Sequence, residues 1–263
     1  MFINNFSASK LSTYEECPLK YKLRYVDRLD PVFNDNSNTD ALHYGSFVHK
    51  VFEDGVEAET MEDLMEIANK ERDNYDFPKS KFQNFKDMCK NFLKLNATLN
   101  EVGEAEQRFK FQFGDPEKDM NVNGIIDRII KSESGKYLVI DYKTSKRPKT
   151  QMDLFRDDQM KMYAYAVTQL YSVSVKDVTL AHFYPHLDKL VTVRFCAADI
   201  ASFLKKVQER MWKIRKMKKD DFSACHNKFC NWCGYKGVCP KFNDQMLIEQ
   251  RMQAFLDTKG DKG

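Results

Sequence analysis

The sequence predicts an α/β fold with a helical N-terminal extension and a Cys-rich C-terminal segment, because its hydrophobic periodicity changes along the chain. Helical patterns dominate residues 1–100. At Glu106–Phe113 the period becomes two, and Phe109, Phe111 and Phe113 alternate with polar side chains. Beyond this predicted strand, further strands alternate with helices. That order is typical of α/β proteins and is also compatible with an α+β arrangement.

The elements follow one another as helices, a three-strand meander, a helix, a strand pair and helices again. Ser9 is the predicted N-cap of the first helix, and residues 31–40 form a loop. We expect helices over residues 9–25, 41–57, 61–72, 79–99, 152–171 and 198–219, and strands over residues 106–113, twice within 123–144, and near 178–185 and 190–197. One domain is expected over residues 1–250, with a helical part (1–100), a core (101–200), a basic helix with a Cys-rich segment (201–250), and then a tail (251–263).

The composition indicates an intracellular protein. No apolar run approaches the length of a membrane span, and "MFINNFSASK" lacks the pattern of a secretory signal, so we expect no membrane partner and a cytoplasmic location. Thiols stay reduced there, so the seven cysteines are expected to be ligands or buried thiols. The net charge of +3 is too small to indicate a nucleic-acid partner. Basic stretches at residues 204–220 and 143–149 could follow phosphates, or could be a solvated helix face and loop.

An acidic hairpin is the most informative segment. "NGIIDRIIKSESGKYLVIDYKT", residues 123–144, has two apolar runs with an aspartate in each, separated by a turn at "SESG". Asp127 and Asp141 are symmetric about Ser134. A turn centred on Glu133–Gly135 places the two aspartates directly opposite each other. A turn centred on all four residues of "SESG" offsets them by one residue.

Opposed carboxylates need a cation between them. Opposite Cβ atoms in a hairpin lie about 4.5–5.5 Å apart, where like charges repel, and hard oxygen ligands favour Mg²⁺, Mn²⁺ or Ca²⁺. Side chains alternate along a strand, so Lys143 lies on the same side as Asp141 and Tyr142 points away. Two acids, a lysine and a metal suit phosphodiester hydrolysis. The alternative is a solvent-facing strand with an ordinary Asp–Lys pair.

Two helical motifs offer further polar side chains. Gly45 and His49 are four residues apart in "GSFVH", hence on one helix face, and a neutral imidazole can ligate a metal. Gln159 and Tyr163 have the same spacing in "QMKMY". A structural histidine and an amphipathic helix with core aromatics are the alternatives. Glu106 is a further candidate outer-shell acid.

Together these motifs resemble the PD-(D/E)XK nuclease core, and more narrowly its RecB/AddB-type branch, which includes CRISPR-associated and phage exonucleases. The matching pieces are Gly124-x-x-Asp127, Asp141-x-Lys143, the Gly-x-x-x-His and Gln-x-x-x-Tyr helices, and "LSTYEECPLKYKLRY", where a lone Cys precedes Pro. They span residues 11–240 in the family's order. The family's Pro-Asp form of the second motif is replaced by Ile126-Asp127, which fits the branch resembled because that branch uses Gly-x-x-Asp.

The resemblance implies a mixed central sheet flanked by helices and a role for each motif residue. Lys143 would support the attacking water and stabilise the transition-state charge. Gln159 and Tyr163 would position the water, the lysine or a phosphate. The ligands implied for Mg²⁺ or Mn²⁺ are His49, Asp127, Asp141 and the carbonyl of Tyr142.

The cysteines predict a second metal site. Cys230, Cys233 and Cys239 have metal-ligand spacing and need a fourth thiolate, and Cys225 is nearby. The resemblance selects Cys17 instead, since the branch often joins one N-terminal and three C-terminal cysteines around a [4Fe–4S] cluster. A four-thiolate structural zinc site with Cys225 remains the alternative. Cys89 and Cys196 are expected to be buried small hydrophobes.

The function implied is a metal-dependent deoxyribonuclease, specifically an exonuclease acting on DNA ends or single strands in recombination, repair or phage DNA metabolism. No Gly-x4-Gly-Lys-Ser/Thr phosphate loop is present, so the enzyme would act alone or beside a helicase or recombination partner. A CRISPR-adaptation or structure-specific endonuclease is an alternative of the same class. A non-catalytic metal-cluster DNA-binding protein is an alternative of another class.

Overall fold

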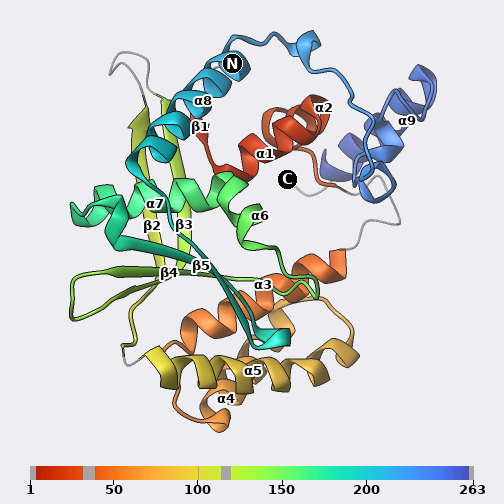
Figure 1. Cartoon of the computed structure of the whole chain (residues 1–263). Coiled ribbons are helices and arrows are strands. Elements are labelled where there is room, and N and C mark those ends of the chain that lie inside the picture. The colour runs from red at the N-terminus through yellow and green to blue at the C-terminus, as the bar shows by residue number, and fades with distance from the viewer. Residues whose placement is uncertain (1–3, 32–38, 100, 114–119, 261–263) are drawn as a thin grey trace. The chain divides into compact units, whose positions relative to one another are not determined.

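The structure is a computed structural model that describes residues 4–31, 39–99, 101–113 and 120–260 (Figure 1). Its contacts divide the chain into two compact units. The central unit comprises residues 39–209, and the terminal unit joins residues 1–38 to residues 210–263. Each unit is described by itself below. The single domain expected over residues 1–250 stays a prediction.

The central unit is built on a mixed sheet, as the sequence predicts (Figure 1). Neighbouring strands pair antiparallel except β4 and β5, which are parallel. The described strands of this unit are β2 (Glu104–Phe113), β3 (Met120–Lys131), β4 (Tyr137–Tyr142), β5 (Val178–Tyr184) and β6 (Lys189–Val193). The predicted meander and strand pair are therefore confirmed, and β4 and β5 join them into one sheet.

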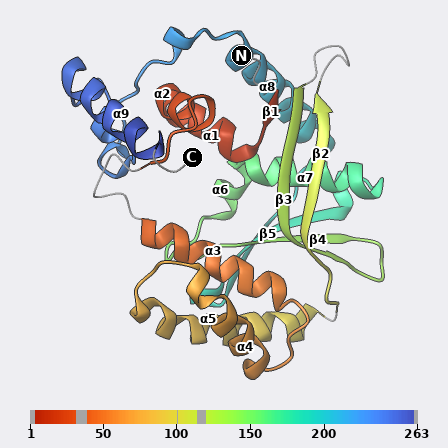
Figure 2. The same ribbon diagram turned by 180° about the vertical axis from the view of Figure 1, so that it is seen from behind.

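Helices lie on both sides of β4 and β5 (Figures 1 and 2). On one side are α3 (Thr39–Asp54), α4 (Met61–Glu71) and α5 (Lys79–Leu99), and on the other is α7 (Asp158–Tyr171). Rings of α3 and α5 form the core against β4, where Phe52 and Phe92 stack with centroids 4.2 Å apart and both contact Tyr142. Tyr142 is thus directed into the core, which leaves its neighbours in β4 on the opposite face.

The single helix expected over residues 152–171 is wrong, because the structure has two. A short α6 (Gln151–Arg156) ends at Asp157, whose backbone is extended (φ −75°, ψ 119°). The Asp157 side chain accepts a hydrogen bond from Gln159 N at 2.9 Å and so caps α7. The helical hydrophobic period continues across this break, but the capping geometry starts a new helix.

The N-terminal helix expected over residues 9–25 is also interrupted. Its N-cap is Ser7 rather than Ser9, and α1 runs from Ala8 to Glu16. Cys17 is extended, since the residue before a proline avoids the helical region, and α2 (Pro18–Tyr21) follows. A π-helical turn over Lys22–Val26 completes the segment.

The terminal unit has a small core made from both ends of the chain. Leu23 and Leu29 pack with Tyr235 and Val238, and Tyr235 Oη donates to the Leu29 carbonyl at 2.8 Å. This unit also contains β1 (Asn5–Phe6), the last part of α8 (Ala197–Lys216) and α9 (Gln245–Gly260).

The predicted tail, the predicted loop and the character of the helices complete the description. Helix α9 covers most of the predicted tail, of which residues 261–263 lie outside the described part. The loop predicted over residues 31–40 falls mainly on 32–38, which also lie outside it. Within the described ranges, no helix combines the length and the apolar character that crossing a bilayer requires.

Candidate active site

The acidic hairpin adopts the first of the two registers considered. Arg128 pairs with Ile140 and Lys131 with Tyr137, and the same register places Asp127 level with Asp141. The turn closes through a hydrogen bond from Ser132 N to the Lys136 carbonyl at 2.8 Å. Gly135 has a φ of +76°, which a glycine adopts without steric cost.

Asp127 lies within β3 and contacts both β4 and α3. Its Oδ2 accepts a hydrogen bond from Tyr142 N at 2.8 Å and lies 3.3 Å from Nδ1 of His49. Partial burial acts to lower the pKa of His49, but the Asp127 carboxylate outweighs it, so this pKa lies above its usual value. The helix motif and the first acid of the hairpin are therefore neighbours in space.

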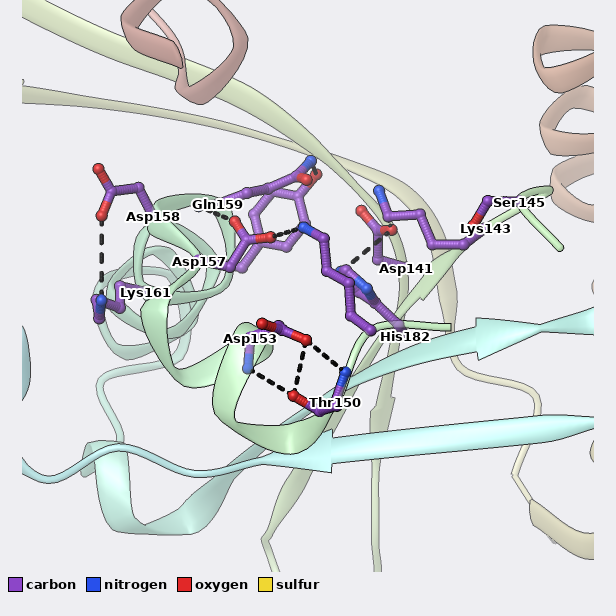
Figure 3. A network of polar contacts seen from close by, with 12 residues as sticks. Asp141, Lys143, Ser145, Thr150, Asp153, Asp157, Asp158, Gln159, Lys161 and His182 are labelled. Atoms are coloured by element: carbon purple, nitrogen blue, oxygen red, sulfur yellow. Dashed lines mark hydrogen bonds and ion pairs between the residues drawn. The ribbon is translucent and has the colours of Figure 1, made fainter. Parts of the chain in front are cut away.

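Asp141 is 2% exposed and faces a lysine on its own strand segment (Figure 3). Its Oδ2 lies 2.5 Å from Lys143 Nζ, and Lys143 N donates to the Phe183 carbonyl at 2.8 Å. Burial raises the pKa of Asp141 to about 6, although Lys143 acts to lower it. The same pairing outweighs the burial of Lys143, whose pKa is raised, so its ammonium remains charged at neutral pH.

Gln159 and Tyr163 reach the site through the backbone of β3. Gln159 Nε2 donates to Tyr163 Oη at 2.8 Å, and Tyr163 Oη donates to the carbonyl of Ile125 at 2.8 Å. Ile125 lies two residues before Asp127 in β3. In this arrangement the pair fixes α7 to the strand that bears the first acid.

Gly124 is required by packing against β2. It lies opposite Phe109, and a Cβ added to it would lie 2.4 Å from Phe109 Cζ. The Phe109 ring also meets Tyr163 edge-on, with centroids 6.1 Å apart. By contrast, a Cβ on Gly45 would lie 3.6 Å from Thr144 Oγ1, which is an ordinary contact.

Glu106 interrupts the pairing of β2 with β3. Ala105 pairs with Arg128 and Gln107 with Ile126, while Glu106 has a φ of +46° and no paired residue between them. Its carboxyl approaches Glu53 of α3, whose pKa is raised by burial and by this neighbour. The register is the same on both sides of Glu106, so Glu106 lies level with Asp127 of the neighbouring strand β3, and β3 separates it from Asp141 of β4.

Sequence reasoning missed His182 of β5. The parallel pairing of β4 with β5 places His182 next to Asp141, and its Nε2 lies 3.8 Å from Asp141 Oδ2 (Figure 3). Burial lowers the pKa of His182 to about 4, so the ring is neutral. The signal that could have found it is the pairing of the two strands, because periodicity alone does not show which strands are adjacent.

The donor set suits a hard divalent cation. Asp127 and Asp141 could offer carboxylate oxygens to such a cation, and His49 an imidazole nitrogen. Oxygen-rich sites of this kind favour Mg²⁺ or Mn²⁺ over soft metals. In the described ranges, no three His, Cys, Asp or Glu side chains are already gathered closely enough to hold a metal ion.

The terminal unit brings Cys17 next to the Cys-rich segment. Cys225 N donates to Cys17 Sγ at 3.4 Å, and Asn227 Nδ2 donates to the Glu16 carbonyl at 3.0 Å. Burial raises the pKa of Cys239, and the nearby Cys17 and Cys230 thiols add to the rise. Two segments far apart in sequence therefore meet here.

The remaining cysteines differ from one another. Cys89 is buried, as expected. The expectation that Cys196 is buried is wrong, since it is exposed just before α8, where its N–H donates to Asp199 Oδ2 at 2.8 Å.

Comparison with known proteins agrees with this architecture. Residues 5–240 match the model of the PD-(D/E)XK nuclease superfamily, and the chain belongs to that superfamily. Two curated relatives are ATP-dependent helicase/deoxyribonuclease subunits B: that of Streptococcus uberis is 29% identical over 54% of this chain and 14% of its own length, and that of Streptococcus agalactiae is 26% identical over 70% and 18%. The chain thus spans less than a fifth of these relatives.

A solved structure supports the fold alone. A protein of Eubacterium rectale, described as a candidate exonuclease, superposes with a TM-score of 0.51 at 14% identity, over 88% of this chain and 87% of its own. Both the nuclease superfamily and the similarity to helicase/deoxyribonuclease subunits B agree with the resemblance found in the sequence.

Proposed function

We propose that the chain is a metal-dependent DNA nuclease, specifically an exonuclease acting on DNA ends or single strands. The observation that supports this best is the meeting of His49, Asp127, Asp141 and Lys143 at the end of the acidic hairpin. An isolated Asp–Lys pair would not require a histidine from α3 or a second acid from β3. Membership of a nuclease superfamily supports the same reaction class.

The ligands proposed for Mg²⁺ or Mn²⁺ are His49, Asp127, Asp141 and the Tyr142 carbonyl. When bound, such a cation lowers the pKa of a water and offsets the charge of a phosphate. The hydrogen bond from Tyr142 N fixes one oxygen of Asp127, and burial makes Asp141 costly to ionise without a cation.

Lys143 is the proposed electrostatic residue. Its ammonium is charged at neutral pH, so it can hydrogen-bond the attacking water and offset negative charge on the phosphate, but it cannot act as a base. Gln159 and Tyr163 are proposed as positioning residues for the water, the lysine or a phosphate. Their hydrogen bonds tie α7 to the backbone of β3 just before Asp127.

A second proposed metal centre is a [4Fe–4S] cluster held by Cys17, Cys230, Cys233 and Cys239. The contacts of Cys225 N and Asn227 Nδ2 bring the two segments together, and none of the four cysteines is in a disulfide. A structural zinc ion that uses Cys225 is the competing assignment.

The cellular setting follows from the relatives. They are helicase/deoxyribonuclease subunits, so we propose a helicase or recombination partner, a DNA substrate and a cytoplasmic location. The basic helix α8 offers Lys and Arg side chains for phosphate contacts.

Digestion of end-labelled linear DNA and of circular DNA, each with Mg²⁺ and with Mn²⁺, tests the proposal. We expect cleavage of single strands or ends with either metal and none in EDTA. Cleavage of closed circles would instead favour a structure-specific or CRISPR-adaptation endonuclease. DNA binding without any cleavage would favour the non-catalytic alternative.

A further inference from the structure

His182 is a fully buried polar side chain that the proposed chemistry does not use. It lies directly beside Asp141 in the parallel β4–β5 pair. Its Nδ1 is 3.2 Å from Tyr184 Oη, and its Nε2 is 3.8 Å from Asp141 Oδ2. Within the described ranges, Nε2 has no hydrogen-bond partner. A buried polar atom without a partner is costly, so this arrangement needs a reason.

The neighbours of His182 determine which ring nitrogen holds the proton. Tyr184 Oη accepts a hydrogen bond from Lys149 N at 2.8 Å, so its single proton is free to point toward His182. Nδ1 then accepts a hydrogen bond from the Tyr184 hydroxyl, and the neutral ring carries its own proton on Nε2. The resulting N–H is directed at Asp141.

The same contacts continue to helix α7. Lys149 Nζ lies 2.5 Å from Asp157 Oδ2, and Asp157 Oδ1 accepts from Gln159 N at 2.9 Å. Figure 3 shows the two ends of this network, His182 beside Asp141 and Asp157 beside Gln159 at the start of α7. The loop between β4 and α6 is therefore fastened on one side to β5 and on the other to the helix that bears Gln159.

We propose that His182 and Tyr184 are positioning residues that hold the Asp141 carboxylate for the divalent cation. This inference rests on the proposed function. Asp141 has a charged partner in Lys143, which must be available for water or phosphate during hydrolysis. The Nε2–H of His182 faces the same oxygen, Oδ2, and a neutral N–H can hold that oxygen in place without adding charge when Lys143 turns to water or phosphate. Hydrogen-bond partners of metal ligands typically change metal affinity by about 10–100-fold.

The test is Mn²⁺ binding to the metal-free full chain, measured by electron paramagnetic resonance or titration calorimetry without DNA. We expect His182→Leu to weaken Mn²⁺ binding by about 10-fold or more. Tyr184→Phe, which keeps the ring and removes the hydroxyl, should weaken it less. His182→Gln should recover part of the affinity, because its amide can donate near the position of Nε2.

Leu180→Ala is the matched control. Leu180 is buried on the same strand and the same side as His182, so its truncation lowers stability without removing a hydrogen bond. Its Mn²⁺ affinity should equal that of the wild type. Wild-type affinity in both His182→Leu and Tyr184→Phe, or equal losses in Leu180→Ala, would overturn the positioning role.

A second measurement reads the tautomer without metal. Nitrogen-15 shifts of the histidine rings should show His182 as the Nε2–H form, with the signal assigned by its loss in His182→Gln. Tyr184→Phe should shift the ring toward a mixture of tautomers. An Nδ1–H form in the wild type would overturn the inference. The expected tautomer in a wild type that binds no Mn²⁺ would instead refute the proposed metal site, and the positioning role with it.

Discussion

Lys143 shows how one side chain can be tied to two tasks. In the metal-free protein its ammonium compensates the buried Asp141 carboxylate at 2.5 Å, while its backbone is fixed to β5. Its side chain is 29% exposed, so it can leave this partner without being drawn through the core. A residue with these properties contributes to electrostatics more than to packing.

Lys143→Ala is therefore expected to lower the cleavage rate by about 10²–10³-fold or more while the protein still folds and binds DNA. The loss arises because, among the described residues, Lys143 supplies the ammonium that pairs with Asp141. Single-turnover cleavage and DNA binding should be measured together. The control is Lys136→Ala, which changes an exposed lysine just before β4 and should behave like the wild type. Turnover near the wild-type rate in Lys143→Ala would refute the assignment.

Asp141 makes stability depend on pH. Its pKa is raised from about 3.8 to about 6, so ionising it costs the folded state up to about 3 kcal/mol. This cost is absent below about pH 4, grows as the pH rises, and is complete above pH 6. In EDTA at pH 7.5, Asp141→Asn should be as stable as the wild type or more stable by about 1–3 kcal/mol, with the difference gone at pH 4.

Urea unfolding of both proteins at the two pH values measures this difference. In the variant, Lys143 loses its carboxylate partner and can turn to solvent. The increase in unfolding free energy is therefore smaller than the full cost of ionising Asp141. A variant clearly less stable than the wild type at pH 7.5 would mark Asp141 as a structural residue.

Much of the site could be predicted residue by residue. Alternation along β4 and the symmetry of the hairpin place Asp127, Asp141 and Lys143 together, because both are local properties of the chain. His182 could not be found this way, since its position depends on which strand pairs with β4. Glu106 was a candidate, but its positive φ follows from an irregular pairing that no pattern predicts.

At the scale of elements, Gly124 and Gly45 make opposite demands although both belong to the nuclease motifs. Gly124 lies under the Phe109 ring, whereas Gly45 has room for a methyl group within α3. Only the first is fixed by close packing between strands. At Gly45, alanine is expected to be favoured, because the interior of a helix prefers alanine to glycine.

Gly124→Ala is expected to destabilise the fold by about 1–3 kcal/mol, because Phe109 and then Tyr163 must move. Gly45→Ala should stabilise it by up to about 1 kcal/mol. Thermal or urea unfolding of the two variants in parallel checks both signs. Equal effects would mean that the Phe109 ring can move aside at no cost.

The breaks in the helices limited the prediction of elements. Hydrophobic periodicity continues through Asp157 and Cys17, so both helices were expected to run on. Local chemistry ended them: Asp157 caps α7, and Pro18 forces Cys17 out of the helical region. These signals are present in the sequence but compete with periodicity, and only the packed structure decides between them.

At the scale of the whole molecule, the terminal unit joins residues 1–38 to residues 210–263, which are far apart in sequence. A metal shared by Cys17 and Cys230 would close a loop of more than two hundred residues. Such closure removes on the order of 4–5 kcal/mol of denatured-state entropy by the disulfide-type estimate, to which ligand binding adds.

Cys17→Ser should therefore remove the metal, bleach any brown colour and lower stability, with activity lost only as a consequence. Cys225→Ser is the matched control and should do little of this, although its N–H contacts Cys17. Iron, sulfide and zinc analysis of the anaerobically purified proteins distinguishes the [4Fe–4S] cluster from the zinc site. One zinc and no iron in the wild type, lost only in Cys225→Ser, would establish the local zinc site instead.

The division of the terminal unit between the chain ends has a consequence for biosynthesis. A ribosome releases residues 1–38 before residues 210–263, with about 170 residues between them. At about 5–20 residues per second, roughly ten to forty seconds pass between the synthesis of Leu23 and Leu29 and that of Tyr235 and Val238, with which they pack. During that interval the nascent chain exposes an apolar surface whose partner does not yet exist, and chaperones have their opportunity to bind it.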